Sequence, residues 1–207
     1  MPLPFSRGFR GRRPAPGTAD RLPPGQYETR DFPELSAGPT PRVSLAAWTF
    51  TLRGADGASA VWTWAEFQAL PRDHVTTDLH CVTKWSKFDT VWEGVAIDTL
   101  LAAAADRGVR PSPFALAMCD GGYTTNVPLA DLTGGKAWVA FGYDNAPLDP
   151  EHGGPARLLV PHLYFWKSAK WVRQLRLLAR DEAGFWEVNG YHMRGDPWRE
   201  QRYTGDP

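Results

Sequence analysis

The sequence predicts a mixed, mainly β fold of the α+β class, with partly barrel-like sheets and a few short helices. Two observations support this prediction. Short apolar or alternating segments recur from position 43 onward, and nearly all are too short to be helices. The helical segments are few, and they do not alternate with the strands as a doubly wound sheet requires. Strands therefore dominate the predicted architecture.

The chain is expected to consist of an N-terminal arm, residues 1–40, and one domain, residues 41–207. The arm is rich in Pro and Gly and has no apolar periodicity. Its basic pair Arg12 and Arg13 is followed by Pro and Gly, where a secretory signal needs an apolar run. No stretch approaches the roughly 20 apolar residues that span a bilayer. We therefore expect a cytoplasmic protein with no membrane insertion.

The first predicted strand of the domain lies at 48–53, where apolar and polar residues alternate, and glycines at 54–57 supply a turn. Thr63 and Glu66 then have the spacing of a capping box. This spacing predicts a short helix that Pro71 closes.

A second strand is predicted to end at Cys81. With a side-chain period of two, Val75, Thr77, Leu79 and Cys81 fall on one face, so Cys81 points inward at the end of the strand. Asp98 is expected to cap the following helix. That helix runs through LLAAAADR and stops before Gly108, and further apolar runs follow at 114–119, 137–143, 157–161 and 171–178.

Composition and motifs exclude several functions. The sequence has 23 Lys and Arg residues and 23 Asp and Glu residues, so its formal net charge is zero. The protein therefore has no overall positive electrostatic potential that would bind it to nucleic acid. Gly134, Gly135 and Lys136 suggest a phosphate-binding loop, but Ala130 stands where its first glycine is required. We interpret this segment as an ordinary turn. The sequence contains no CxxC pair, Cys-rich zinc cluster or HExxH motif.

Cys81 is one of two cysteines, the other being Cys119. Its neighbours His80 and Lys84 suggest an electropositive setting that favours a thiolate, the form that binds metals. A lone cysteine cannot hold a tetrahedral zinc ion, so the remaining metal ligands would come from a cofactor. Two other interpretations stay open on the residues alone: a Cys/His hydrolase, and a non-catalytic binding domain that has lost the metal.

The segment HCVTKWS at 80–86, followed by DTVWEGV at 89–95, resembles the molybdenum-binding core of the sulfite oxidase superfamily. That superfamily includes sulfite oxidases, eukaryotic nitrate reductases and bacterial methionine-sulfoxide reductase subunits. The resemblance covers roughly residues 25–203 and continues in DGGYTT (120–125), HGGPAR (152–157) and WKSAKW (166–171). It implies a sulfite-oxidase-type molybdopterin-binding fold and a cofactor of molybdenum with one pterin per metal.

The resemblance also implies residue roles at the metal. Cys81 corresponds to the thiolate that completes a metal sphere otherwise made by the pterin dithiolene and oxygen groups. Tyr191, five residues after Trp186, aligns with a tyrosine near the metal in sulfite oxidases. We therefore expect Cys81 and Tyr191 to be catalytic residues and Cys81 to be the metal ligand.

Further along the chain, the resemblance implies residues that hold the pterin. His152 and Arg157 match residues that contact the pterin and its phosphate, and Ser168, Ala169 and Lys170 match a loop that closes over the same end. Their chemistry suits this role, because Arg grips phosphate with two hydrogen bonds and Lys adds a point charge.

The implied activity is two-electron oxygen-atom transfer on a small substrate. The arginine that meets the substrate anion in sulfite oxidases has no clear counterpart in the arm, so we favour reduction of an S-oxide or N-oxide over sulfite oxidation. The chain has no room for the dimerisation or haem domains of the larger oxidases. We therefore expect a monomer that exchanges electrons with a separate electron-transfer protein.

Overall fold

The computed structural model describes residues 18–207. Residues 1–17, which include Arg12 and Arg13, lie outside the described residues. None of the helices between residues 18 and 207 is long and apolar enough to cross a membrane.

A six-stranded sheet and a five-stranded sheet organise the described residues. In the larger sheet the order is β1, β5, β8 and β10, while β4 pairs with β5 and β9 pairs with β8. Its strands are β1 (Tyr27–Glu28), β4 (Asp73–His80), β5 (Trp85–Ala96), β8 (Trp138–Tyr143), β9 (Ala146–Pro147) and β10 (Arg157–Leu159). The smaller sheet contains, in spatial order, β3 (Ser59–Thr63), β2 (Thr49–Arg53), β11 (Val172–Leu178), β6 (Phe114–Cys119) and β7 (Thr124–Pro128).

The helices are short connections between these strands. The α-helices are α1 (Trp64–Gln68), α2 (Ile97–Ala105), α3 (Leu129–Leu132) and α4 (Phe185–Val188). Single turns of 3-10 helix are η1 (Ala19–Arg21), η2 (Leu45–Ala47), η3 (Asp120–Gly122), η4 (Pro150–His152) and η5 (Phe165–Lys167).

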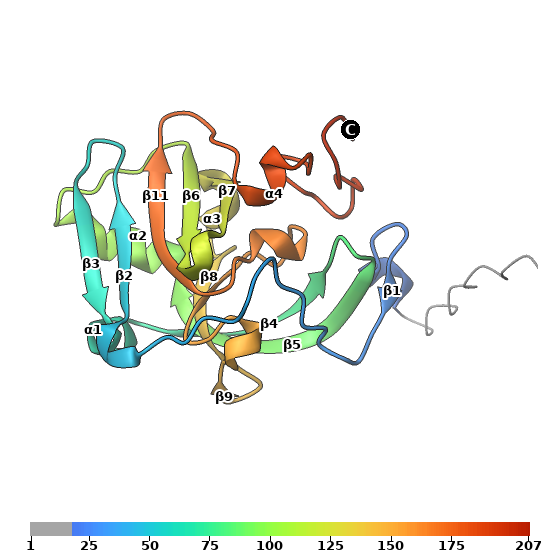
Figure 1. The fold of residues 1–207 in the computed structure, drawn as a ribbon, viewed down its shortest axis with the longest axis horizontal. Coiled ribbons are helices and arrows are strands. Elements are labelled where there is room, and N and C mark those ends of the chain that lie inside the picture. Colours follow the sequence, from blue (N-terminus) through green and yellow to red (C-terminus); the bar gives the residue numbers. More distant parts are fainter. Residues whose placement is uncertain (1–17) are drawn as a thin grey trace, which may run out of the picture.

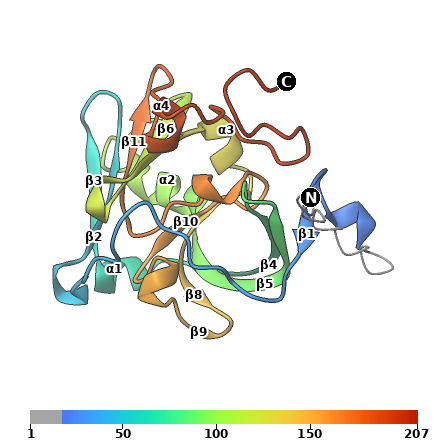
Figure 2. The same ribbon diagram turned by 45° about the vertical axis from the view of Figure 1, so that its right-hand side comes forward.

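The predicted mainly β, α+β class with a few short helices is confirmed. Figure 1 shows the five-stranded sheet on one side of the molecule, with β4 and β5 extending toward the other side. Figure 2 shows that β4 and β5 curve together. Within residues 18–207, however, neither sheet closes into a barrel, because each retains edge strands.

Several local predictions are confirmed by the elements that form. In β2 the side chains of Phe50 and Leu52 are fully buried while their neighbours are at least partly exposed, as the alternation predicts. Thr63 and Glu66 form a reciprocal capping box at α1, with the Thr63 amide donating to Glu66 Oε2 over 2.8 Å. The apolar runs at 114–119, 137–143, 157–161 and 171–178 become β6, β8, β10 and β11.

The strand predicted before Cys81 forms, and it ends one residue earlier than expected. Strand β4 ends at His80, and its pairing with β5 shifts register between Thr77 and Leu79. The extra residue of this shift lies in β5, so β4 keeps its period of two, and Val75, Leu79 and Cys81 pack in one apolar cluster. His80 is buried as well, beside Trp198. Cys81 follows the strand in a tight turn, in which Lys84 N donates to Cys81 O over 2.9 Å. Its side chain is nevertheless buried, as expected.

The expected cap of α2 is wrong. The residue at the N-cap is Ala96, and Asp98 lies inside the first turn. The Asp98 carboxylate instead accepts hydrogen bonds from Gly134 N over 3.0 Å and from Gly135 N over 2.9 Å. These glycine amides therefore face a carboxylate, which agrees with an ordinary turn and not with a phosphate loop.

Candidate functional site

A cavity of about 610 Å³ opens between the two sheets and the loops at their ends. It is bordered by the turn after β4, by η3, by the segment from η4 to β11 and by α4. Every residue that the sequence analysis selected lines this one cavity: Cys81, His152, Arg157, Ser168, Ala169, Lys170 and Tyr191. Residues more than 100 positions apart in the chain are thus brought to one site.

The Cys81 thiol is held inside the protein. Thr83 Oγ1 donates a hydrogen bond to Cys81 Sγ over 3.1 Å. Burial raises the pKa of the thiol, and the opposing effects of Thr83 and the positive charge of Arg202 are smaller. The expected thiolate-favouring setting is therefore wrong for the protein alone. A bound metal would itself supply the charge that deprotonates a coordinating thiol.

The neighbours of Cys81 do not activate it as a hydrolase would. The His80 Nδ1 atom lies 2.9 Å from Ser86 Oγ, and burial lowers the pKa of His80 to about 4, so the ring is neutral at neutral pH. The Lys84 side chain is exposed. Among residues 18–207, no group of three or more His, Cys, Asp or Glu side chains is placed to hold a metal ion. A metal at Cys81 would therefore need ligands from outside the chain.

Arg157 is a buried cation at another part of the cavity. Its guanidinium donates to His152 O over 2.6 Å and to Ser168 O over 2.5 Å, so its described partners are neutral carbonyl groups. The Nε atom is buried without a hydrogen-bond partner among the described residues. Burial lowers the pKa of Arg157 to about 9. A buried positive charge without a carboxylate is costly, and an anionic ligand would compensate it.

Two further basic residues adjoin Arg157. Burial, followed by the positive charges of Arg157 and Lys170, lowers the pKa of His152. Burial and the charge of Arg157 likewise lower the pKa of Lys170, to about 8. The Lys170 ammonium donates to Glu151 O, and the buried His152 Nδ1 has no partner among the described residues. The positive charges of Arg157 and Lys170 thus disfavour a charge on His152, and the wall holds buried nitrogen atoms without partners among the described residues.

A glycine allows this wall to form. Gly153 has φ +109°, and a Cβ atom there would lie 3.0 Å from Lys170 Cα and 3.1 Å from Arg157 Cβ. A side chain would push the basic residues apart. The turn after η4 can therefore approach β11 and β10 closely only because residue 153 is glycine.

Ser168 and Ala169 line the cavity, but much of their polar capacity is used within the protein. Ser168 Oγ accepts a hydrogen bond from Val160 N over 2.8 Å, and Ser168 N donates to Phe165 O over 3.1 Å. Ala169 O accepts from Leu158 N over 2.8 Å. These bonds fix the loop between β10 and β11, which in turn fixes Lys170 at the cavity.

Tyr191 lies among aromatic side chains in the same cavity. Its ring contacts Trp166 at a centroid distance of 5.1 Å and Trp186 at 4.9 Å. Burial raises the pKa of Tyr191, and negative charge on Tyr203 or Cys81 raises it further. The Tyr191 hydroxyl is therefore protonated at neutral pH, in the same cavity as Cys81.

Sequence reasoning missed the contribution of the arm. Phe32 and the Pro-rich segment that follows it to Pro41 line the cavity, and in Figure 1 this segment crosses the front of the molecule between β1 and β2. Phe32 stacks on His152 with ring centroids 4.0 Å apart. No local pattern marks residues 32–41, since they are mostly exposed and form neither strand nor helix.

The cavity combines one buried thiol with a separate cluster of cations and unused donors. The buried, partnerless Arg157 Nε and His152 Nδ1 fit a ligand that is anionic and rich in hydrogen-bond acceptors. The aromatic side chains Trp85, Tyr123, Phe165 and Trp186 form much of the remaining wall and suit a flat ring system. These features agree with a phosphorylated, metal-binding pterin.

Comparisons with known proteins support the same assignment. The family model described as "Oxidoreductase molybdopterin binding domain" matches residues 37–186. The chain is 40% identical to the oxidoreductase YuiH of Bacillus subtilis over 188 residues, which cover 90% of this chain and 93% of that protein. It is 26% identical to the sulfite oxidase of Arabidopsis thaliana over 78% of this chain and 50% of that protein.

Among solved structures, the sulfane dehydrogenase SoxCD of Paracoccus pantotrophus shares the fold. The TM-score is 0.60 at 22% sequence identity, and the match covers 69% of this chain and 41% of that chain. The chain thus spans about half, or less, of this structure and of the plant sulfite oxidase. The family match and the cavity together show that the chain belongs to the molybdopterin-binding oxidoreductases of the sulfite oxidase superfamily.

Proposed function

We propose that this oxidoreductase binds molybdenum with a single molybdopterin per metal, and that Cys81 is the protein ligand to the metal. The proposal rests on one observation: the buried thiol of Cys81 and the basic side chains of Arg157 and Lys170 line the same cavity. Among the described residues, the partners of the Arg157 guanidinium are carbonyl groups and not carboxylates. When bound, this cofactor supplies two-electron oxygen-atom transfer chemistry. Thiolate sulfur is a ligand that such a metal prefers.

The basic residues would hold the phosphate and the pterin. Arg157 offers its partnerless Nε–H, His152 offers Nδ1, and Lys170 adds a positive charge. The hydrogen bonds from Arg157 to His152 O and Ser168 O keep the guanidinium in place before the ligand arrives. Such preorganisation reduces the entropy lost on binding.

We propose reduction of a small S-oxide or N-oxide as the reaction, with sulfite oxidation as the second candidate. The Lys, Arg and His side chains that line the cavity within residues 18–207 are Arg157, Lys170 and His152, which adjoin one another. All three are taken by the proposed cofactor contacts. An anionic substrate would need a further cation, whereas a neutral S-oxide would need a hydrogen-bond donor.

Tyr191 would be that donor. Its raised pKa keeps the hydroxyl protonated, and a protonated phenol can donate a hydrogen bond to the oxygen of a bound substrate. Tyr191 and Cys81 line the same cavity, which supports a position of the hydroxyl near the metal.

The remaining proposals concern the setting of the reaction. A separate electron-transfer protein exchanges single electrons with the domain, since oxygen-atom transfer moves two electrons and the proposed cofactor needs to be restored after each turnover. We also propose a monomeric, cytoplasmic protein in which residues 1–40 form an arm and residues 41–207 form the oxidoreductase domain. Sedimentation and fractionation of cells would test the last two points.

Metal analysis and parallel assays test the proposed function. Protein from a host that makes molybdopterin should contain about one molybdenum per chain, because one thiol and one cation cluster line the cavity. The loaded protein is then assayed with reduced viologen plus S-oxides or N-oxides, and separately with sulfite plus ferricyanide. Stoichiometric zinc, or no metal after growth with molybdate, would refute the cofactor, and faster sulfite oxidation would refute the preferred direction.

A further inference from the structure

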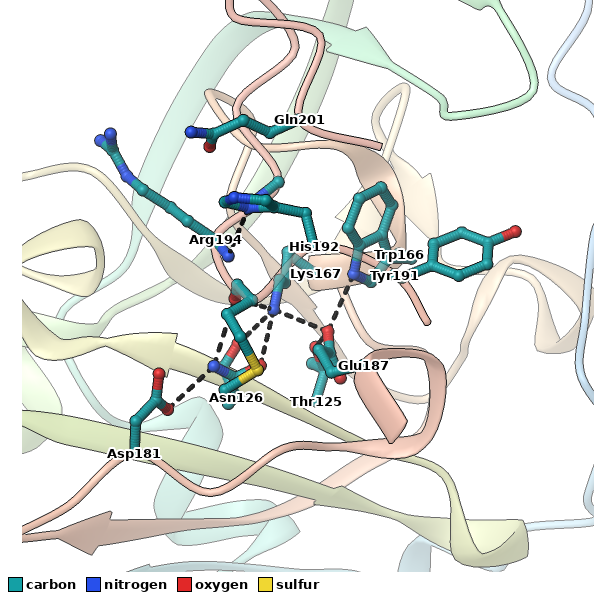
Figure 3. Close-up of polar contacts among 12 residues, drawn as sticks. Thr125, Asn126, Trp166, Lys167, Asp181, Glu187, Tyr191, His192, Arg194 and Gln201 are labelled. Carbon is teal, nitrogen blue, oxygen red and sulfur yellow. Dashed lines mark hydrogen bonds and ion pairs between the residues drawn. The ribbon is translucent and has the colours of Figure 1, made fainter. Parts of the chain in front are cut away.

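Two tryptophans in the cavity wall are each followed by a buried charged residue. Trp166 and Lys167 belong to η5, and Trp186 and Glu187 belong to α4. The tryptophans line the cavity, whereas the charged residues do not. Behind the wall, Lys167 Nζ lies 2.6 Å from Glu187 Oε1, and both side chains are 0% exposed. Figure 3 shows Lys167 at the centre of this polar cluster.

Lys167 connects several parts of the chain. Besides Glu187, its ammonium donates to Asn126 O over 2.8 Å, to Asn126 Oδ1 over 2.7 Å and to Met193 O over 2.7 Å. Asn126 Nδ2 in turn donates to Asp181 Oδ1 over 2.8 Å. Strand β7, η5, α4 and the C-terminal segment are therefore linked through one buried cation (Figure 3).

Glu187 extends the cluster to the cavity wall itself. Its Oε1 atom accepts hydrogen bonds from Trp166 Nε1 over 2.9 Å and from Thr125 Oγ1 over 3.0 Å, in addition to Lys167. The indole of Trp166 thus lines the cavity with its ring while its N–H is held by the buried carboxylate. A rotation of this ring would break the Trp166–Glu187 hydrogen bond inside the protein, which is costly.

Tyr191 rests on both tryptophans. Its ring is nearly perpendicular to that of Trp166, with an interplanar angle of 84°, and it is tilted by 37° from that of Trp186. Tyr191 N also donates to Trp186 O over 3.0 Å. The position of the phenol is therefore determined by two indoles, one of which Glu187 holds directly, while the other precedes Glu187 in α4.

A buried ion pair is a poor way to gain stability alone, because desolvation offsets most of the attraction. Apolar side chains of similar size would fill the same space at little or no cost in stability. Such apolar side chains would not provide an acceptor for Trp166 Nε1. They would also not fix the side-chain conformations of Trp166 and Trp186. The contacts of Lys167 and Glu187 therefore point to precise placement of the cavity wall.

We propose that Lys167 and Glu187 are positioning residues that set the place of the Tyr191 hydroxyl in the cavity. This inference rests on the proposed role of Tyr191 as hydrogen-bond donor to the substrate. Neither Lys167 nor Glu187 touches the substrate in this proposal, and both act through Trp166 and Trp186.

The test compares variants by the fluorine NMR signal of 3-fluorotyrosine, assigned to Tyr191 by its loss in Tyr191→Phe. Glu187→Gln keeps an oxygen that can accept from Trp166 Nε1. The double variant Lys167→Met, Glu187→Leu removes both charges and that acceptor. A matched control, Arg72→Met with Glu93→Leu, removes an ion pair of 2.8 Å that does not border the cavity.

The double variant should remain folded but shift and broaden the Tyr191 signal. In loaded protein its kcat should fall by about tenfold to a hundredfold, as expected for a misplaced catalytic group, with molybdenum content and KM changed much less. Glu187→Gln should stay close to wild type in the fluorine signal, and the control pair should leave the signal and kcat unchanged.

A wild-type Tyr191 signal and kcat in the double variant would overturn the proposal, as would an equal shift in the control pair. If the double variant does not fold, Thr125→Val takes its place. This change removes one hydrogen bond to Glu187 and leaves the Lys167–Glu187 ion pair intact, so no buried charge is left unpaired. An unmoved Tyr191 signal in this variant also overturns the proposal. The fluorine signal requires neither cofactor nor substrate. A failure of the proposed function, seen as missing molybdenum or missing turnover, is thus distinguishable from a failure of this inference.

Discussion

Phe32 of the arm stacks on His152 of the cavity wall, with ring centroids 4.0 Å apart and ring planes 10° from parallel. The same phenyl ring contacts Trp85, Tyr143 and Phe165. Residues 27–29 are held separately, by the pairing of β1 with β5, so the Phe32 ring is the aromatic contact between the cavity wall and the segment that runs from Phe32 to Pro41.

Phe32→Ala should loosen the segment from Phe32 to Pro41 without unfolding the domain, while the pairing of β1 with β5 remains. Each lost aromatic contact is worth about 1 kcal/mol. The segment from Phe32 to Pro41 should therefore leave the cavity wall much more often than in wild type. Trypsin should then cleave faster after Arg30 or Arg42, and the loaded protein should lose cofactor sooner. Leu35→Ala is the control, because Leu35 lines the same cavity but is half exposed. Equal cleavage rates for the two variants would refute the role of Phe32.

Cys81→Ser should keep the fold but lose turnover, because a hydroxyl is a much poorer metal donor than a thiolate and has nearly the same size. Cys119→Ser should cost far less, since burial raises the pKa of the Cys119 thiol to well above its usual range and this thiol is not in the cavity wall. Visible absorption and turnover measure the difference. Wild-type turnover in Cys81→Ser would remove Cys81 from the metal.

Arg157→Ala should yield protein that is poor in molybdenum. The substitution removes a buried cation that has no carboxylate partner among the described residues, together with its hydrogen bonds to His152 O and Ser168 O, so unfolding of the empty protein is measured alongside. Binding of the phosphate should weaken by several kcal/mol, by analogy with broken buried ion pairs. Elemental analysis after chelation and mild heating gives the answer, with exposed Arg110→Ala as control. Full retention of molybdenum would place the phosphate elsewhere.

Tyr191→Phe should slow turnover while molybdenum stays bound, because only the hydroxyl is removed and the ring contacts with Trp166 and Trp186 remain. Steady-state kinetics and metal analysis on the same preparation test this expectation. If molybdenum is lost in parallel with activity, Tyr191 supports the cofactor and does not serve the substrate.

Asp131 should make stability depend on pH at the acid end. Burial alone would raise the pKa of Asp131, but hydrogen bonds from His162 and Arg194 outweigh it and lower the pKa far below the ordinary value. A carboxylate with a depressed folded pKa contributes stability above its unfolded pKa of about 3.9 and loses it as the pH falls further. Asp131→Asn should therefore cost about 2 kcal/mol at pH 7 and much less near pH 2. Urea unfolding at both pH values checks this, with exposed Asp56→Asn as reference.

How much the sequence could predict depended on the distance between interacting residues. The alternation at Phe50 and Leu52 and the capping box at Thr63 and Glu66 are local, and both appear as expected. The alternation before Cys81 is also local, and it placed Cys81 on the same face as Leu79, whereas the extra residue in β5 depends on its pairing with β4 and left no pattern in the sequence. Asp98 resembled a cap, but its partners lie 36 and 37 residues away at the glycine turn.

The candidate site shows the same division. Resemblance to a family located Cys81, Arg157 and Tyr191, which then met in one cavity. The thiol's pKa could not be inferred from its neighbours in sequence, because burial outweighs nearby charges. The pairing of Lys167 with Glu187 also left no sequence signal. In the sequence, a buried lysine cannot be distinguished from an exposed one, because the four acceptors of its ammonium group become known only from the structure.

The stacking of Phe32 also constrains how the protein is assembled. All aromatic partners of Phe32, from Trp85 to Phe165, are synthesised after it, so the Phe32 ring can make all its contacts only when most of the chain has left the ribosome. A residue that is made early thus waits for contacts with parts of the chain that are made much later. Phe32 and the residues after it, up to Pro41, form part of the cavity wall, so this wall is complete only after the later-made partners of Phe32 are in place.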